Sequence, residues 1–265
     1  MFRFWRRRKR RRLKKQPFPD AWCEIIRRRV PYYALLTNAE REQLHGHILV
    51  LLAEKEFVGV DGVEITDDIR VTVAAQAALL LLNRDTDYFP DLYSIVIYPH
   101  EFAAPTTERL EDGTVLESYQ TRIGESWDRG QLVLSWRDVV LGAADDADGT
   151  NVVLHEFAHQ LDSEVGATDG APNLPRAQQH EWARVFTERY RQLIADLNAG
   201  RSTCLNPYAA KNPAEFFAVS TESFFEQPVR LRSCHPDLYE RLQLFYRQDP
   251  ATRWEPHRPT TEGLA

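Results

Sequence analysis

Two histidines and a glutamate in the stretch NVVLHEFAHQLD (151–162) have the types and the spacing of a hydrolytic metal site. On a helix, His155 and His159 lie one above the other on the same face, because positions i and i+4 are about one turn apart. Their imidazole nitrogens can then reach one ion at the ~2.0–2.1 Å that zinc requires. Glu156 projects beside them, where it can accept a proton from an activated water without being a ligand.

The alternative interpretation is a core helix whose two histidines are satisfied by hydrogen bonds. The stretch is apolar at most of its other positions: Val152, Val153, Leu154, Phe157, Ala158 and Leu161. Ionisable residues are uncommon in such buried surroundings. Three of them at this spacing therefore favour the metal site over the core helix.

Two histidines need a third ligand, and the residues that follow directly do not supply one. In the long pattern that ends in a third histidine, a glycine and a histidine would be required where this chain has Asp162 and Val165. Asp162 lies two helical turns after His155, and its short side chain would reach a metal poorly from there. We expect Asp162 to hydrogen-bond a ligand histidine instead; the alternative is a simple contact with the loop at the C-terminal end of the helix.

The remaining candidates are two glutamates in NPYAAKNPAEFFAVSTESFFE (206–226). Asn212 and Pro213 are typical of a helix start, so Glu215 could simply be a capping glutamate. The helix is otherwise largely apolar, and Glu215 and Glu222 are seven residues apart on the same stripe. Buried carboxylates need partners. A metal for one and a ligand histidine for the other would satisfy both, but the residues alone do not rank Glu215 above Glu222.

Hydrophobic periodicity predicts the elements that must position these residues. We expect helices over 38–55, 66–83, 176–200 and 236–248, with further helix within 206–228, and strands over 92–99, 114–122 and 130–136. The strand GQLVLSW (130–136) could be an edge strand along which an extended peptide pairs. The pattern predicts an α+β fold: a mainly helical domain with a small mixed sheet, forming a single domain over residues 20–250.

Charge is distributed very unevenly along the chain. The first fifteen residues carry ten Lys or Arg and no acid, whereas the rest carries 23 basic and 39 acidic residues. We expect a basic, disordered head over residues 1–19 and a flexible tail over 251–265. The head could also contact an anionic membrane or a nucleic acid, whereas the acidic body is a poor nucleic-acid binder.

Cysteine usage and apolar runs indicate where the protein works. The three cysteines, Cys23, Cys204 and Cys234, are far apart, which argues against a disulfide framework and fits a reducing compartment. No apolar region follows the basic head as in a secretory signal, and the longest apolar stretch (71–82) is too short to span a bilayer. We therefore expect a cytoplasmic protein.

The stretch VVLHEFAHQLD, followed by NPYAAKNPAEFFAVSTESFFEQP, resembles the Mlc titration factor A family of bacterial cytoplasmic zinc peptidases. GVEITDDIRVTVAAQAALLLL and LYSIVIYP extend the resemblance over most of residues 20–250. It implies a gluzincin-like fold similar to the catalytic domain of anthrax lethal factor. It also implies that His155, His159 and Glu215 bind one Zn²⁺, that Glu156 is the general base and that Tyr208 is the active-site tyrosine.

The resemblance implies peptide-bond hydrolysis, with the choice between endopeptidase and aminopeptidase activity left open, and binding to an Mlc-like transcriptional repressor of sugar uptake. Tyr208 would donate a hydrogen bond to the oxyanion of the tetrahedral intermediate; from the residues alone, a packing tyrosine is equally expected. The alternative function is a protein that mainly sequesters the repressor and has little physiological peptidase activity.

Overall fold

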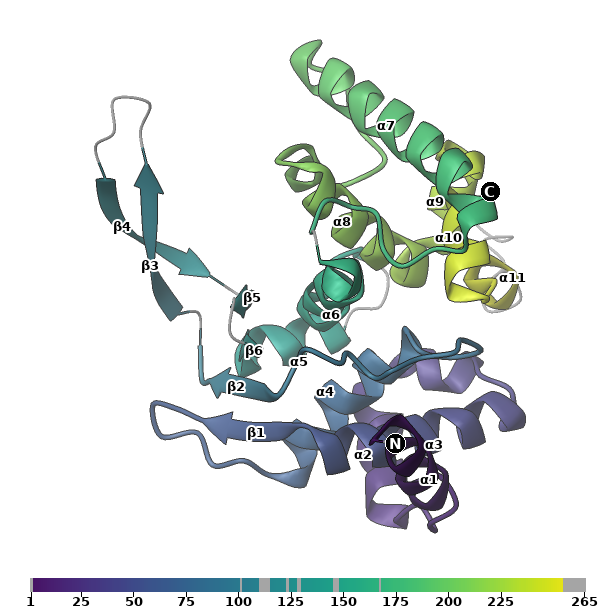
Figure 1. Ribbon diagram of the computed structural model, residues 1–265. Helices are drawn as coiled ribbons and strands as arrows, with labels where there is room; N and C mark the ends of the chain where they lie inside the picture. Colours follow the sequence, from purple (N-terminus) through teal and green to yellow (C-terminus); the bar gives the residue numbers. More distant parts are fainter. Residues whose placement is uncertain are drawn as a thin grey trace, which may run out of the picture.

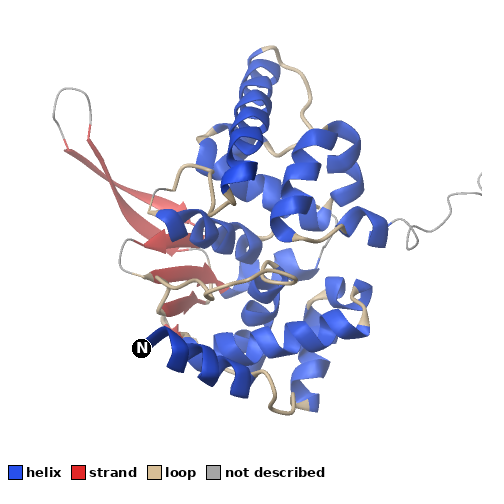
Figure 2. Cartoon of the chain, turned by 45° about the vertical axis from the view of Figure 1, so that its right-hand side comes forward, coloured by secondary structure: helices blue, strands red, loops and turns tan. Residues whose placement is uncertain are grey.

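The computed structural model describes residues 2–100, 102–109, 115–122, 124–127, 130–144, 148–166 and 168–254. Helices dominate, and the strands gather on one side of the molecule (Figure 2). In Figure 1 the N-terminal helices lie below, helix α6 lies in the middle and the C-terminal helices lie above. The fold is therefore the expected mainly helical α+β arrangement, with α6 placed between two groups of helices.

The N-terminal group begins with α1 (Phe2–Leu13), α2 (Asp20–Arg29), the 3-10 helix η1 (Pro31–Leu35), α3 (Asn38–Glu54) and α4 (Asp67–Leu79). Helix α3 is capped by Thr37. The Thr37 hydroxyl accepts from the Glu40 N–H at 3.3 Å, and the Glu40 carboxylate accepts from the Thr37 N–H at 3.0 Å. Helix α4 is buried along Val71–Leu79, as its apolar sequence predicted.

The basic head differs from the expectation of disorder, because the structure places helix α1 within it. Arg and Lys are good helix formers, and so nothing local prevents a helix here. Arg10 is only 6% exposed and forms ion pairs with Glu54 and Asp87. This long-range contact, which the local sequence does not reveal, holds the helix against α3.

Four strands form the small mixed sheet, in the order β1 (Glu56–Gly59), β2 (Ser94–Tyr98), β6 (Gln131–Ser135) and β5 (Gly124–Trp127). The first three run parallel, and β5 runs antiparallel to β6. A hairpin of β3 (Phe102–Arg109) and β4 (Val115–Arg122) extends away from the body (Figure 1). The prediction that GQLVLSW is an edge strand is wrong, since β6 pairs on both sides; β5 is the edge, and it lies against α6.

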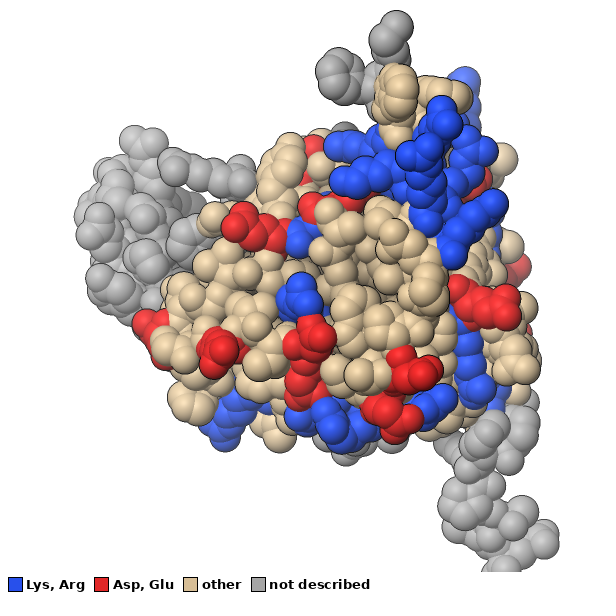
Figure 3. Space-filling view, turned by 90° about the horizontal axis from the view of Figure 1, so that it is seen from below, with Lys and Arg blue, Asp and Glu red and all other residues tan. Residues whose placement is uncertain are grey.

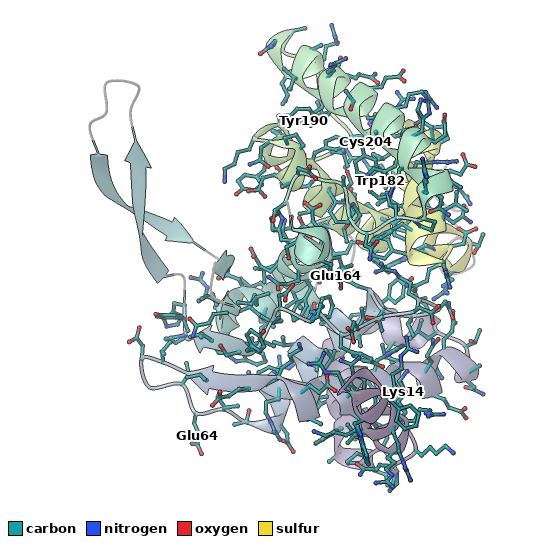
Figure 4. The ribbon with its side chains drawn as sticks, in the orientation of Figure 1. Lys14, Glu64, Glu164, Trp182, Tyr190 and Cys204 are labelled. Carbon is teal, nitrogen blue, oxygen red and sulfur yellow. The ribbon has the colours of Figure 1, made fainter. Side chains whose placement is uncertain are left out.

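The C-terminal half consists of α5 (Trp136–Ala144), α6 (Val152–Asp162), η2 (Ser163–Val165), α7 (Arg176–Asn198), η3 (Pro207–Ala210), α8 (Pro213–Glu226), α9 (Pro228–Cys234), α10 (Pro236–Tyr246) and α11 (Pro250–Trp254). Helix α8 is the centre of this half, because every residue from Ala214 to Glu226 is buried. Trp182 and Tyr190, labelled on α7 in Figure 4, contact the α8 rings Phe217 and Phe216 at centroid distances of 5.7 Å each. The flexible tail was predicted for residues 251–265; residues 251–254 lie in α11, where Ala251 is buried, and residues 255–265 lie outside the described ranges.

One glycine in the loop between η2 and α7 contacts three helices. The Gly170 N–H donates to Asp162 of α6 at 2.7 Å, and its carbonyl accepts from the Trp182 indole of α7 at 2.9 Å. Its φ is +82°, and a Cβ atom there would lie 2.5 Å from the Pro213 carbonyl oxygen of α8. Only glycine fits such a position without strain. The loop thus sets the spacing of α6, α7 and α8.

Within the described ranges, no helix combines the length and the apolar character that crossing a bilayer would require.

Candidate metal centre

Helix α6 presents the motif because its first turn is firmly fixed. The Asn151 side chain caps the helix, accepting from the Leu154 N–H at 3.0 Å, and its amide donates to Gln76 of α4 at 2.7 Å. Val153, Leu154, Phe157, Ala158 and Leu161 of α6 are buried in the core, and Val152 is partly buried. His155 consequently faces helix α8.

Three side-chain atoms from α6 and α8 converge on one point. The Nε2 atoms of His155 and His159 lie 3.2 Å apart, and Oε2 of Glu215 lies 3.0 Å from the first and 3.3 Å from the second. Each of these side chains is 11–13% exposed, so the site is sheltered yet open to a small ion. Two imidazoles and a carboxylate are a zinc-type ligand set with an open position. These residues could therefore bind a metal.

The second oxygen of Glu215 is held away from this point. Oε1 accepts from the Tyr208 hydroxyl at 3.2 Å and from the Lys211 ammonium at 3.1 Å. Lys211 also donates to the Tyr208 hydroxyl at 3.0 Å. Glu215 thus offers Oε2 alone to a metal. Sequence reasoning missed Lys211, although its spacing of three residues from Tyr208 and four from Glu215 is the signal that could have revealed it.

Glu222 lies behind His155, as one of the two open assignments expected. Its Oε1 lies 2.7 Å from Nδ1 of His155, and its Oε2 accepts from the backbone N–H of Asn151 at 2.6 Å. A carboxylate bonded to the far nitrogen of a ligand histidine fixes its tautomer and its orientation. The structure therefore separates the two glutamates: Glu215 joins the converging atoms, and Glu222 supports His155.

The expectation that Asp162 hydrogen-bonds a ligand histidine is wrong. Its Oδ2 accepts from the Gly170 N–H, while Oδ1 is buried without a partner, as is Nδ1 of His159. Asp162 lies at the last turn of α6, beside the loop that leads to α7. Its carboxylate is therefore bonded by the Gly170 N–H of that loop. Asp162 therefore anchors this loop to the end of the motif helix.

Burial and charge perturb the titration of the converging groups. Burial opposes protonation of His155, but the negative charge of Glu222 and the hydrogen bond to Glu215 raise its pKa well above the usual range. Burial also opposes ionisation of Glu215, but hydrogen bonds from His155 and His159 lower its pKa far below the usual range. Both shifts therefore reflect attraction between a His155 imidazolium and the carboxylates around it, and a bound cation would have to replace that proton.

Glu156 is placed beside the converging atoms without joining them. It is 6% exposed, and burial raises the pKa of its carboxyl, opposed by the positive charges of His155 and His159. A buried carboxylate whose pKa is raised is suited to accept a proton near neutral pH. Tyr208, 49% exposed, lies on the open side of the site with its ring centroid 6.0 Å from that of His155.

Comparison with known proteins places the whole chain in one family. A family model described as glucose-regulated metallo-peptidase M90 matches residues 2–247. The chain is 40% identical over 238 residues to an uncharacterized protein of Synechocystis, covering 89% of this chain and 86% of that protein. It is 30% identical over 240 residues to Mlc titration factor A of Yersinia pestis, covering 88% and 87%. The resemblance found in the sequence is confirmed: the chain belongs to the glucose-regulated metallo-peptidase M90 family.

Proposed function

We propose that this protein is a zinc-dependent peptidase in which His155, His159 and Glu215 hold one Zn²⁺. The observation that carries the proposal is the convergence of two imidazole nitrogens and one carboxylate oxygen, 3.0–3.3 Å apart, from two largely buried helices. Nitrogen and oxygen ligands of this kind suit zinc, and metallopeptidase membership supports the same conclusion. The gluzincin-like fold, similar to the lethal factor catalytic domain, is part of this proposal.

In the proposed reaction, bound zinc supplies an acidified water and polarises the scissile carbonyl. Glu156 accepts the proton from the attacking water and passes it to the leaving amine. Tyr208 donates its hydroxyl hydrogen to the oxyanion, for which it must turn from Glu215. Lys211 keeps its hydrogen bond to Oε1 of Glu215 during this step, so only Oε2 of Glu215 is offered to the metal.

An extended peptide would pair with β5, the free edge that lies against α6. Backbone hydrogen bonds along an edge strand bind a peptide without selecting its sequence. We include aminopeptidase activity in the proposal. Matched peptides with free and acetylated N-termini test it, because an aminopeptidase cleaves only the free form.

Glu156→Gln tests the mechanism most directly. The variant keeps its shape and the three proposed ligands, so we expect unchanged zinc content and loss of at least about 100-fold in peptide hydrolysis. Glu215→Gln is the matched variant, and it should lose zinc as well as activity. Full hydrolysis by Glu156→Gln, or zinc retained at parental affinity in Glu215→Gln, would overturn the assignment.

A second function rests on the similarity to Mlc titration factor A of Yersinia pestis, whose name refers to titration of Mlc. We propose that the chain also binds an Mlc-like repressor in the cytoplasm, where its acidic body would complement a basic DNA-binding partner. If sequestration is the main role, Glu156→Gln binds the repressor as tightly as the parent does. Loss of binding in this variant would tie the repressor to the catalytic site.

A further inference from the structure

Helix α1 is fixed to the body along one side. The Arg10 guanidinium donates to both carboxylate oxygens of Glu54, at 2.9 and 2.8 Å, and lies 4.7 Å from the Tyr88 ring centroid. One turn later the Lys14 side chain runs against Gly46 of α3, and Figure 4 shows Lys14 directed toward the body. Bidentate and buried contacts of this kind hold a helix in one orientation. Its opposite side is therefore presented in a fixed direction.

The outward side of α1 carries cations and aromatic rings. Positions i, i+4, i+7 and i+8 share a helical face, and here they are Phe4, Arg8, Arg11 and Arg12, followed by Lys15 in the turn after the helix, all exposed. The neighbouring Trp5 is 61% exposed, as is Phe4. Figure 3 shows Lys and Arg gathered over one part of the face seen from below.

These cations have no acidic partners of their own. Among the residues that the structure describes, no carboxylate forms an ion pair with the four outward cations of α1, whereas Arg10 on the inner side has two. Like charges within one or two helical turns repel one another. An approaching anionic partner therefore lowers the free energy of such a surface.

We propose that the outward side of α1 docks this protein on an anionic lipid bilayer. Each Lys or Arg close to an anionic leaflet favours binding, and exposed Trp and Phe side chains prefer the membrane interface. Phe4 and Trp5 stand together at one end of the cationic face, where they can enter the headgroup layer. The body, with 39 acidic against 23 basic residues, repels a long nucleic acid that would have to pass along it.

A cleft beside α1 gives a headgroup a place to bind. Its volume is about 730 Å³, and its lining includes Trp5, Arg6 and Lys9 of the helix and Tyr93 of the body, together with Glu54 and Asp87, whose carboxylates pair with Arg10. Trp5 and Tyr93 are 61% and 64% exposed, so two exposed aromatic rings line the cleft together with cations. Cations near exposed aromatic rings suit the phosphate of an anionic lipid at the depth where the rings partition.

Vesicle cosedimentation of the full chain tests the proposal. We expect the protein to sediment with vesicles containing about 30% phosphatidylserine, and not with pure phosphatidylcholine, at roughly 0.1 M salt. Binding should fall at about 1 M salt, because the Debye length there is only ~3 Å. No binding to the anionic vesicles, or tighter binding to a single-stranded oligonucleotide, would overturn the proposal.

Charge reversal distinguishes α1 from overall charge. Arg8→Glu/Arg11→Glu should weaken vesicle binding at least about 25-fold, since each cation contributes roughly fivefold. Arg176→Glu/Arg191→Glu is the matched control, with the same change of net charge at exposed positions of α7, far from α1 (Figure 1). Equal loss in the control would refute a specific docking surface.

A second variant keeps the test valid if the first does not fold. Phe4→Ser/Trp5→Ser removes the rings from exposed positions, and it should weaken binding to the anionic vesicles while thermal unfolding is unchanged. Undiminished binding in this variant would contradict insertion of the rings. Deleting residues 1–15 is a poorer test, because it also removes Arg10 from Glu54.

Discussion

Replacing Glu222 by Gln tests whether a carboxylate is required behind the metal site. The two groups that contact Glu222 are both donors when His155 points its Nε2 toward a metal: Nδ1–H of His155 at 2.7 Å and the Asn151 N–H at 2.6 Å. A carboxylate accepts both bonds. The amide of Gln accepts one and turns its NH₂ group toward the other donor, which is left unsatisfied.

The expected loss follows from that count of donors. Removing the partner of a ligand histidine weakens metal binding about 10- to 100-fold, which corresponds to roughly 1.4–2.7 kcal/mol. An unsatisfied buried donor costs about 1–3 kcal/mol of folding free energy in addition. Glu222→Gln should thus bind zinc more weakly, and it should unfold at lower urea concentration with or without zinc.

Competition with a chromophoric chelator measures the zinc affinity of purified Glu222→Gln and of the parent. Ser220→Ala is the matched control, because Ser220 lies on the same helix, is fully buried and has a hydroxyl without a partner. The control should keep parental affinity. A zinc affinity of Glu222→Gln within about threefold of the parent would refute the supporting role assigned to this carboxylate.

Three further changes have defined outcomes. Arg10→Met should cost about 2–3 kcal/mol in urea unfolding because it leaves Glu54, whose side chain is only 14% exposed, without its ion-pair partner, whereas exposed Arg8→Met should cost less than about 0.5 kcal/mol; equal costs would contradict docking of α1. Burial raises the pKa of Asp162 to about 6, so the folded state holds this proton more tightly than the unfolded one. Unfolding free energy of the metal-depleted protein should therefore fall by up to about 3 kcal/mol from pH 4 to 6, and Asp162→Asn should lack this component; parallel pH profiles would refute it. Gly170→Ala should lower stability by about 1–3 kcal/mol, because its φ is +82° and the new methyl meets the Pro213 carbonyl; unchanged thermal unfolding would contradict this.

Local patterns sufficed for the parts of the site that lie on single helices. The spacing of His155 and His159 and the apolar body of α4 are properties of short stretches, so periodicity reveals them. The choice between Glu215 and Glu222 needed the distance between α6 and α8, which depends on how the whole C-terminal half packs. From the residues alone it stayed open, and only the family resemblance selected Glu215.

The expectations for the head, the strand GQLVLSW and Asp162 were wrong because they depend on contacts between residues far apart in the sequence. The head was expected to be disordered because its charges repel, and the partners that fix Arg10 come from positions 44 and 77 residues away. The strand GQLVLSW was expected at an edge because its partner β5 has only four residues, too few for periodicity to reveal a strand there. Asp162 was expected to hydrogen-bond a histidine because the loop that brings the Gly170 N–H to it has no periodic pattern that would reveal this contact.

The contacts of Gly170 bear on when zinc can bind during synthesis. His155 leaves the ribosome sixty residues before Glu215, a delay of about 3–12 s at ordinary rates of translation. In that interval α6 lacks both its third ligand and the packing of Pro213 on Gly170 that sets its distance from α8. Two histidines alone hold a metal weakly, so the nascent chain would bind little metal before Glu215 has been made. Glu215 joins the two histidines only once α8 has been made and has packed against the loop.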